Sequence, residues 1–264
     1  MGKIISVANQ KGGVGKTTTA INLSASIALL GKKVLLIDMD PQANASSGLG
    51  IEADSRGIYE LLLGDASQEE VICCTEIEML KIIPSRVDLT GAEIELVSKE
   101  SREKVLKSAL NGVREEFEFV IIDCPPSLGL LTLNALAVSN SVLIPMQCEY
   151  YALQGLSHLL KTLKLIKKSI NPDLKVEGIL LTMFDSRTLL AAQVKDQVQK
   201  YFSDFLLKTI IPRNVRLSEA PSHGKPIVLY AGRSRGADSY VELAKEIISR
   251  SKLDERTSLK GSGV

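Results

Sequence analysis

The strongest chemical signal in the sequence is a short segment rich in glycine and lysine, at residues 11–18. It consists of Lys11, Gly12, Gly13, Val14, Gly15, Lys16, Thr17 and Thr18, and it lies between an apolar run and an amphipathic one. In a strand–loop–helix of this kind, glycines let backbone N–H groups face phosphate oxygens, and the helix N-terminus adds partial positive charge. We therefore expect a P-loop that binds a nucleoside triphosphate.

The side chains of this loop have separate predicted roles. Lys16 should contact the β- and γ-phosphates, the Thr17 hydroxyl should bind Mg²⁺, and Thr18 should reach the α-phosphate. The general pattern G-x-x-x-x-G-K-[ST] is not strictly met, because Gln10 occupies its first glycine position and a second lysine, Lys11, follows. An ordinary glycine-rich turn and a solvated surface lysine are the alternative interpretations.

Three aspartates follow two apolar runs that are expected to be strands. Asp38 ends the run at 34–38, Asp40 follows it two residues later, and Asp123 ends the run at 119–123. Ligands of parallel sheets bind beyond the carboxyl ends of the strands, so these acids should lie beside the phosphate loop. Asp123 is the candidate Mg²⁺ carboxylate, acting through a bound water, and Asp38 is expected to help hold the same water shell. Asp40 is the candidate for positioning the attacking water; a helix cap is the alternative for any one of them.

Apolar runs and amphipathic runs alternate along the chain, which predicts an α/β fold with right-handed crossovers. We expect a single-domain P-loop NTPase over residues 1–253, with a twisted, mostly parallel sheet, helices on both faces, and a polar, disordered tail at 254–264. The predicted strands are 4–8, 34–38, 80–83, 119–123, 142–146, 178–184 and 209–211. The predicted helices are 17–30, 91–113, 128–138, 152–170, 189–206 and 238–251.

Composition bounds the class of protein without identifying a partner. Hydrophobic residues make up 45% of the 264 residues and the net charge is +1. With four cysteines, none in a C-x-x-C pair, and two histidines, a zinc site is not expected. We see no signal peptide and no apolar run of the ~20 residues that cross a bilayer, so we expect a cytoplasmic protein with free thiols.

Several segments resemble the ParA/Soj family of chromosome and plasmid partitioning ATPases. The loop has the deviant Walker A form K-G-G-x-G-K-T-T, which related families share. More specific to the chromosomal Soj branch are D-M-D-P-Q-A-N at 38–44, C-E-Y-Y-A-L at 148–153 and I-P-R-N-V-R-L-S-E-A-P-S at 211–222. Further matching segments extend over nearly the whole chain.

The resemblance implies a Mg²⁺-dependent ATPase that forms an ATP-dependent homodimer, in which Lys11 contacts nucleotide bound by the other subunit. It also implies nonspecific binding of double-stranded DNA, association with the nucleoid, no membrane association, and hydrolysis stimulated by a partner of the ParB/Spo0J type. Further nucleotide contacts are implied for Glu149, Met183, Pro212, Arg213 and Asn214, although a simple turn would also explain the last three.

One stretch of the chain is clearly basic. Residues 187–235 carry nine Lys or Arg against three acids, a local net charge of +6. Such a segment can bind DNA phosphates, although a charged run is usually only a solvated face. Together with the resemblance, it makes six residues the candidate DNA contacts: Arg187, Lys200, Arg216, Lys225, Arg233 and Arg235.

Three other classes of protein share some of these features. A membrane-cycling ATPase of the MinD type has the same loop but needs an amphipathic C-terminal helix, for which the tail is too polar. An iron–sulfur reductase needs exposed cysteines at a dimer seam, whereas Cys124 is expected to pack as a small apolar residue. A nucleotide-binding scaffold without turnover is the third.

Overall fold

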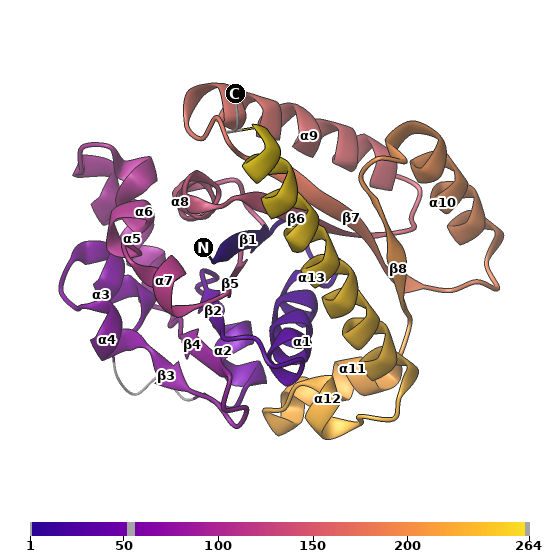
Figure 1. The fold of residues 1–264 in the computed structure, drawn as a ribbon, viewed down its shortest axis with the longest axis horizontal. Helices are drawn as coiled ribbons and strands as arrows, with labels where there is room; N and C mark the ends of the chain where they lie inside the picture. The colour runs from indigo at the N-terminus through magenta and orange to yellow at the C-terminus, as the bar shows by residue number, and fades with distance from the viewer. Residues whose placement is uncertain (1, 52–55, 262–264) are drawn as a thin grey trace.

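The computed structural model describes residues 2–51 and 56–261, and over these ranges the strands form one eight-stranded sheet (Figure 1). The order across the sheet is β3-β4-β2-β5-β1-β6-β7-β8, and all neighbours are parallel except β3 and β4. The strands are β1 (Lys3–Val7), β2 (Val34–Asp38), β3 (Cys73–Cys74), β4 (Leu80–Ile83), β5 (Phe119–Asp123), β6 (Ser141–Gln147), β7 (Lys175–Phe184) and β8 (Leu206–Pro212). The predicted α/β, mostly parallel sheet is therefore confirmed.

Helices connect the strands and cover both faces of the sheet, as predicted (Figure 1). The α-helices are α1 (Lys16–Leu29), α2 (Asn44–Gly48), α3 (Ile58–Leu63), α4 (Gln68–Val71), α5 (Leu89–Glu95), α6 (Val105–Ala109), α7 (Val113–Glu116), α8 (Leu130–Val138), α9 (Ala152–Ser169), α10 (Leu189–Phe202), α11 (Val215–Glu219), α12 (Ile227–Tyr230) and α13 (Arg235–Gly261). Short 3₁₀ turns lie at η1 (Leu96–Ser98), η2 (Arg102–Lys104) and η3 (Ala220–His223).

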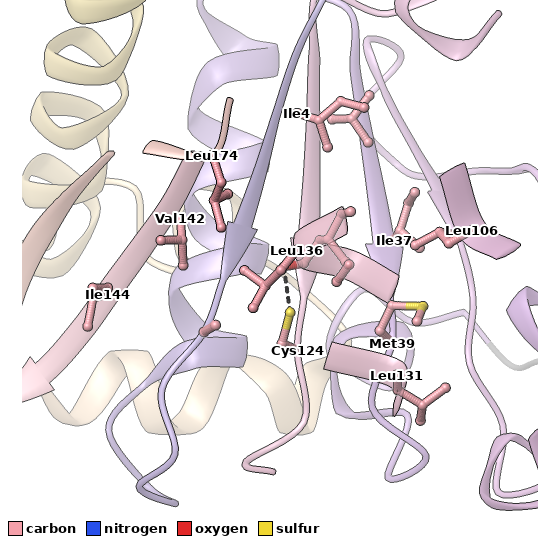
Figure 2. Close-up of a cluster of buried hydrophobic side chains, with 14 of the residues drawn as sticks. Ile4, Ile37, Met39, Leu106, Cys124, Leu131, Leu136, Val142, Ile144 and Leu174 are labelled. Atoms are coloured by element: carbon pink, nitrogen blue, oxygen red, sulfur yellow. Dashed lines mark hydrogen bonds between the residues drawn. The ribbon is translucent and has the colours of Figure 1, made fainter. Parts of the chain in front are cut away.

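The central strands β1, β2, β5 and β6 are buried on both faces, which explains their long apolar runs. In β1, Ile4 packs into the core beneath α3, α6, α8 and α9, while the next residue, Ile5, packs into the core beneath α1 and α13. Successive side chains of a strand point to opposite faces, so each strand contributes to both cores. Figure 2 shows the first core, where Ile37 and Val142 from the sheet meet Leu136 of α8.

The predicted helix at 91–113 is the largest error in the element predictions. In the structure this stretch is divided among α5, η1, η2, α6 and the start of α7. Ser101 adopts a φ of 51° and Gly112 a φ of 83°, both in the left-handed region that interrupts a right-handed helix. The polar residues at 98–101 supply no side chain for the core, and Lys99 Nζ instead donates to the backbone oxygens of Leu62 and Leu63, at 3.2 and 2.8 Å.

The last helix is longer than predicted. α13 runs from Arg235 to Gly261, beyond the predicted end at 251, so most of the predicted polar tail is helical, and residues 262–264 lie outside the described residues. α13 packs against α1 and β8 (Figure 1). The division into a domain at 1–253 and a tail stays a prediction.

Candidate functional site

The phosphate loop lies between β1 and α1, as the sequence predicts. Its turn depends on Gly13 and Gly15, whose φ angles of 72° and 84° are easily adopted only by glycine. Gly15 immediately precedes α1, so the free N–H groups of the first helical turn face the loop. The backbone therefore forms an anion-binding concavity at a helix N-terminus.

Lys16 is folded back over this loop. Its side chain is largely buried, and Nζ donates a hydrogen bond to the Lys11 carbonyl oxygen at 3.2 Å. Burial lowers the pKa of Lys16, and the nearby carboxylates of Asp123 and Asp40 oppose this shift. The ammonium group therefore lies between the loop and the acids, where it can meet phosphate oxygens.

The carboxyl ends of β2 and β5 bring two acids together. Asp38 and Asp123 are register partners across these strands, and Asp123 is also the register partner of Val7 at the end of β1. In the structure these acids lie close together beside the phosphate loop, as the sequence predicts. The strand order places β5 between β1 and β2, which puts Asp123 nearest the loop.

Asp123 has the features of a carboxylate that holds a metal ion through water. It is fully buried, and among the described residues neither carboxylate oxygen has a hydrogen-bond partner. Burial, with a contribution from Asp38, raises the pKa of Asp123 well above its usual value, while the neighbouring Thr17 side chain and Lys16 act against this shift. A buried charge without a partner is costly, and a hydrated Mg²⁺ would compensate it. Asp123 and Thr17 therefore fit a Mg²⁺ site, where the ion would neutralise phosphate charge.

Asp38, in contrast, is fully engaged with the protein. Its Oδ1 accepts from the backbone N–H of Asp40 at 3.1 Å, and its Oδ2 accepts from the N–H and the hydroxyl of Ser46, at 2.9 and 2.8 Å. Burial still raises the pKa of Asp38, while the bonds from Ser46 lower it. Asp38 thus fastens the segment after β2, and its predicted contact with the Mg²⁺ water shell stays a prediction.

Asp40 lies at the start of that segment, beside the cluster. Only 7% of it is exposed, and its Oδ1 accepts from the N–H of Gln42 at 3.0 Å. Its charge is close enough to influence both Lys16 and Asp123. The carboxylate is therefore near the phosphate loop, as a residue that orients a water molecule must be.

Sequence reasoning missed three side chains that hold the loop in place. Gln147 Nε2 donates to the Gly13 carbonyl oxygen at 3.1 Å, and Thr182 Oγ1 donates to that of Val14 at 2.8 Å. Asn9 Oδ1 accepts from the N–H of Lys11 at 3.1 Å. All three lie at or just beyond the ends of β1, β6 and β7, so the strand-end argument that selected the aspartates also applied to them.

The second lysine of the loop has a partner within the same chain. Lys11 Nζ forms an ion pair with a carboxylate oxygen of Glu149, between β6 and α9. Both side chains are about half exposed, at 48% and 51%. The structure thus joins two predicted nucleotide-contacting residues to each other at the rim of the site.

The predicted adenine-contacting residues meet at the ends of β7 and β8. Pro212 is the register partner of Phe184, and the N–H of Arg213 donates to the Phe184 carbonyl oxygen at 3.1 Å. Met183 has a φ of 49°, and its Cε would lie 3.7 Å from a Cβ at Gly15, so it adjoins the loop. Asn214 caps α11 by accepting from the N–H of Arg216 at 2.9 Å. Asn214 thus has a local structural role as a helix cap, and its adenine contact stays a prediction.

The six basic candidates lie along the part of the chain after β7. Arg187 precedes α10, Lys200 lies in α10 and Arg216 in α11; Figure 1 shows these helices at the β8 edge of the sheet. Lys225, Arg233 and Arg235 surround α12 and the start of α13, and all six except the half-buried Lys225 are exposed. Three of them are paired with acids: Arg187 with Asp185 at 2.7 Å, Arg216 with Glu219 at 2.8 Å, and Lys225 with Glu76 at 3.3 Å.

With this geometry in place, comparison with known proteins decides the family. A family model described as an AAA domain matches residues 2–176. The sporulation initiation inhibitor protein Soj of Bacillus subtilis (strain 168) is 61% identical over 249 residues, which cover 94% of this chain and 98% of that protein. The chromosome partitioning protein ParA of Myxococcus xanthus (strain DK1622) is 57% identical over 252 residues, covering 95% and 89%. This chain belongs to the ParA/Soj family.

Solved structures agree with this assignment. A Mycobacterium smegmatis protein described as cobyrinic acid a,c-diamide synthase, with a bound ATP analogue and magnesium, has a TM-score of 0.83 at 37% identity and covers 96% of both chains. The cell division ATPase MinD of Pyrococcus furiosus has a TM-score of 0.79 at 29% identity, covering 94% and 99%. This ParA/Soj protein is a Mg²⁺-dependent partitioning ATPase, which excludes a scaffold without turnover.

One of the alternative classes, the iron–sulfur reductase, depended on a cysteine that the structure now describes. Cys124 is completely buried between the sheet and α8, its thiol bonds weakly to the Ile122 carbonyl oxygen at 3.9 Å, and burial raises its pKa (Figure 2). Cys124 therefore packs as a small apolar residue, as predicted, and is not an exposed cluster ligand. In the described part of the chain, no helix is both long enough and apolar enough to cross a membrane.

Proposed function

We propose that this ATPase is a DNA-binding switch timed by nucleotide. ATP joins two copies face to face, the dimer binds double-stranded DNA without sequence preference, and hydrolysis stimulated by a ParB/Spo0J-type partner releases it. This cycle would drive segregation of a chromosome or plasmid on the nucleoid. The observation that carries the proposal is the position of the Lys11 side chain, which is half exposed at the rim of the phosphate loop and pairs there with Glu149.

Lys11 can exchange its partner at small cost. Its ammonium group is held only by Glu149 among the described residues, and exposed ion pairs of this kind contribute about 0–1 kcal/mol. Beside it, a Cβ added at Gly12 would find no described atom within 4 Å. The loop therefore presents an open surface that a second backbone can approach, and Lys11 can turn from Glu149 to a phosphate in the facing copy.

Each residue of the cluster has a separate proposed role in ATP hydrolysis. Lys16 and the loop backbone bind and orient the phosphates, while Thr17 and Asp123 hold the Mg²⁺ that neutralises phosphate charge. Asp40 orients the attacking water, because its carboxylate lies near Lys16 and Asp123 without being tied to either. Phosphoryl transfer needs mainly positioning and charge neutralisation, so no strong general base is required.

DNA binding depends on the exposed basic residues after β7. One copy offers a limited set of phosphate contacts, and several of its arginines are partly neutralised by neighbouring acids. Joining two copies doubles the contacts at high effective concentration, which raises affinity steeply and makes it dependent on salt.

A single assay of ATP hydrolysis tests the whole cycle. Phosphate release is measured for the protein alone, with duplex DNA, with the N-terminal peptide of a candidate ParB, and with both together. We expect slow turnover alone and at least about tenfold stimulation when both are present, as for a step limited by completing the catalytic arrangement. Equal rates in all four mixtures would overturn the partner-stimulated cycle, while the ATPase assignment would remain.

A further inference from the structure

A chain of buried hydrogen bonds connects the end of β4 to Asp40. The N–H of Ser85 donates to Ser46 Oγ at 2.9 Å, and that hydroxyl donates to Asp38 Oδ2 at 2.8 Å. The N–H of Ser46 adds a second bond to the same oxygen at 2.9 Å, and the other carboxylate oxygen of Asp38 accepts from the N–H of Asp40 at 3.1 Å. Ser85, Ser46 and Asp38 are at most 1% exposed.

We propose that Ser46 is a positioning residue for ATP hydrolysis, which acts through Asp38 to fix the backbone of Asp40. This inference rests on the proposed role of Asp40 in orienting the attacking water. Among the described residues, the Ser46 hydroxyl has hydrogen bonds with Ser85 and Asp38 and none with the phosphate loop or Asp123, so its connection to Asp40 passes through Asp38.

The local backbone explains why such a brace is needed. Ala43 lies between Asp40 and α2 with a φ of 53°, a conformation that costs a residue with a side chain of the order of 1 kcal/mol. α2 itself has only five residues, too few to hold its place without tertiary contacts. The bonds that Asp38 accepts from Asp40 and from Ser46 therefore fix the two ends of the 40–46 segment to the carboxyl end of β2.

Removal of the Ser46 hydroxyl would loosen this segment in a defined way. Asp38 Oδ2 would retain one donor in place of two, and the buried N–H of Ser85 would lose its acceptor. Hydrogen bonds to a buried carboxylate are stronger than neutral ones, and a displacement of about 1 Å at a reacting group can cost up to 10²-fold in rate. The loss should therefore appear in kcat, because nucleotide binding depends on Lys16 and the loop.

The test compares Ser46→Ala with its neighbour Ser47→Ala. Ser47 is the matched control, since it is exposed and, among the described residues, its hydroxyl bonds only to the Asn44 carbonyl oxygen, at 3.4 Å. Steady-state hydrolysis is measured against ATP and against Mg²⁺ concentration, alongside thermal unfolding. We expect Ser46→Ala to lower kcat about tenfold, with the KM for ATP and the Mg²⁺ requirement within about twofold, and Ser47→Ala to change none of these.

Two further variants make the result decisive. Ser46→Thr keeps the hydroxyl, so its kcat should be within about threefold of that of the unmodified protein. This variant also provides a test if Ser46→Ala proves unstable. If Ser46→Ala is no slower than Ser47→Ala, or if Ser46→Thr is as slow as Ser46→Ala, the positioning role is refuted. Asp40→Ala is measured in parallel: unchanged hydrolysis in that variant would refute the proposed role of Asp40 itself, which separates the two failures.

Discussion

At the scale of single residues, two adjacent aspartates of the same cluster are in opposite situations. Asp38 receives three hydrogen bonds from the protein, whereas Asp123 receives none from the described residues. Both are buried, so the difference does not come from access to water. It comes from the chain beyond each strand: Asp40 and Ser46, in the segment after β2, donate to Asp38, whereas no described residue after β5 donates to Asp123.

This contrast predicts a specific defect for Asp123→Asn. The neutral amide keeps the size of the side chain but removes the charge that would hold hydrated Mg²⁺, so half-maximal activity should need at least about tenfold more Mg²⁺. Titration of ATPase activity with Mg²⁺ at saturating ATP provides the measurement. A titration curve that matches the unmodified protein would contradict the assignment.

Asp40→Ala should separate binding from hydrolysis. The substitution removes the carboxylate proposed to orient water but leaves the loop, Lys16 and Asp123 in place. We expect a dimer that persists with ATP and Mg²⁺, with phosphate release reduced at least about 100-fold. Size-exclusion chromatography with ATP measures the dimer, and a protein that elutes only as monomer would count against this prediction.

At the scale of elements, the strand–loop–helix unit uses its glycines for different purposes. Gly15 turns the chain into α1 with a φ of 84°, and a Cβ there would approach Met183. Gly12 has neither a positive φ nor a close neighbour within its own chain, since a Cβ added there would meet no described atom within 4 Å. A side chain at Gly12 would therefore extend into open space, where the proposed face-to-face dimer places the second copy.

Gly12→Val and Gly15→Val form a matched pair that tests this difference. Gly12→Val should bind ATP within about threefold of the unmodified protein, yet fail to dimerise, because the added side chain occupies the surface where the second copy approaches. Gly15→Val should lose ATP binding, since a β-branched residue strongly disfavours positive φ. Fluorescent-nucleotide binding and size-exclusion with ATP distinguish the two; a normal ATP dimer of Gly12→Val would argue against the face-to-face arrangement.

At the scale of the whole molecule, the excess of positive charge is concentrated in one stretch of the chain. The net charge is only +1, but the stretch at 187–235 carries +6; it begins with α10 at the β8 edge of the sheet and continues through α11 and α12, where Lys225 pairs with Glu76 between β3 and β4 (Figure 1). The proposed DNA binding therefore has a local source of positive charge, although the protein is nearly neutral.

Charge reversal at this edge should weaken DNA binding without affecting the dimer. Arg187→Glu and Arg216→Glu should each lower affinity for duplex DNA about tenfold at moderate salt and reduce its salt dependence. Arg56→Glu is the control, because Arg56 is also exposed and paired, with Glu70 at 2.7 Å, but precedes α3 on the opposite side of the sheet. Equal gel shifts for all three variants would refute the two arginine assignments.

The sequence by itself determined the fold class, the phosphate loop and the acids of the cluster. β2, β4 and β5 match the predicted bounds; β2 and β5 are buried along their whole length and are apolar up to their final aspartate, and in β4 only Lys81 interrupts the apolar run. The loop and its acids were also within reach, since glycines before a helix and aspartates after a parallel strand have fixed positions relative to one another.

Only the tertiary structure decided which partner each of these groups has. Lys11 meets Glu149, Gln147 meets Gly13, and Ser46 joins Asp38 to Ser85, contacts that span up to 138 residues of sequence. The order of strands in the sheet sets these contacts, and local periodicity does not encode that order. For the same reason the helix predicted at 91–113 is broken: its apolar residues suit a helix, but Ser101 and Lys99 take conformations and bonds set by the packing of α3 and α5.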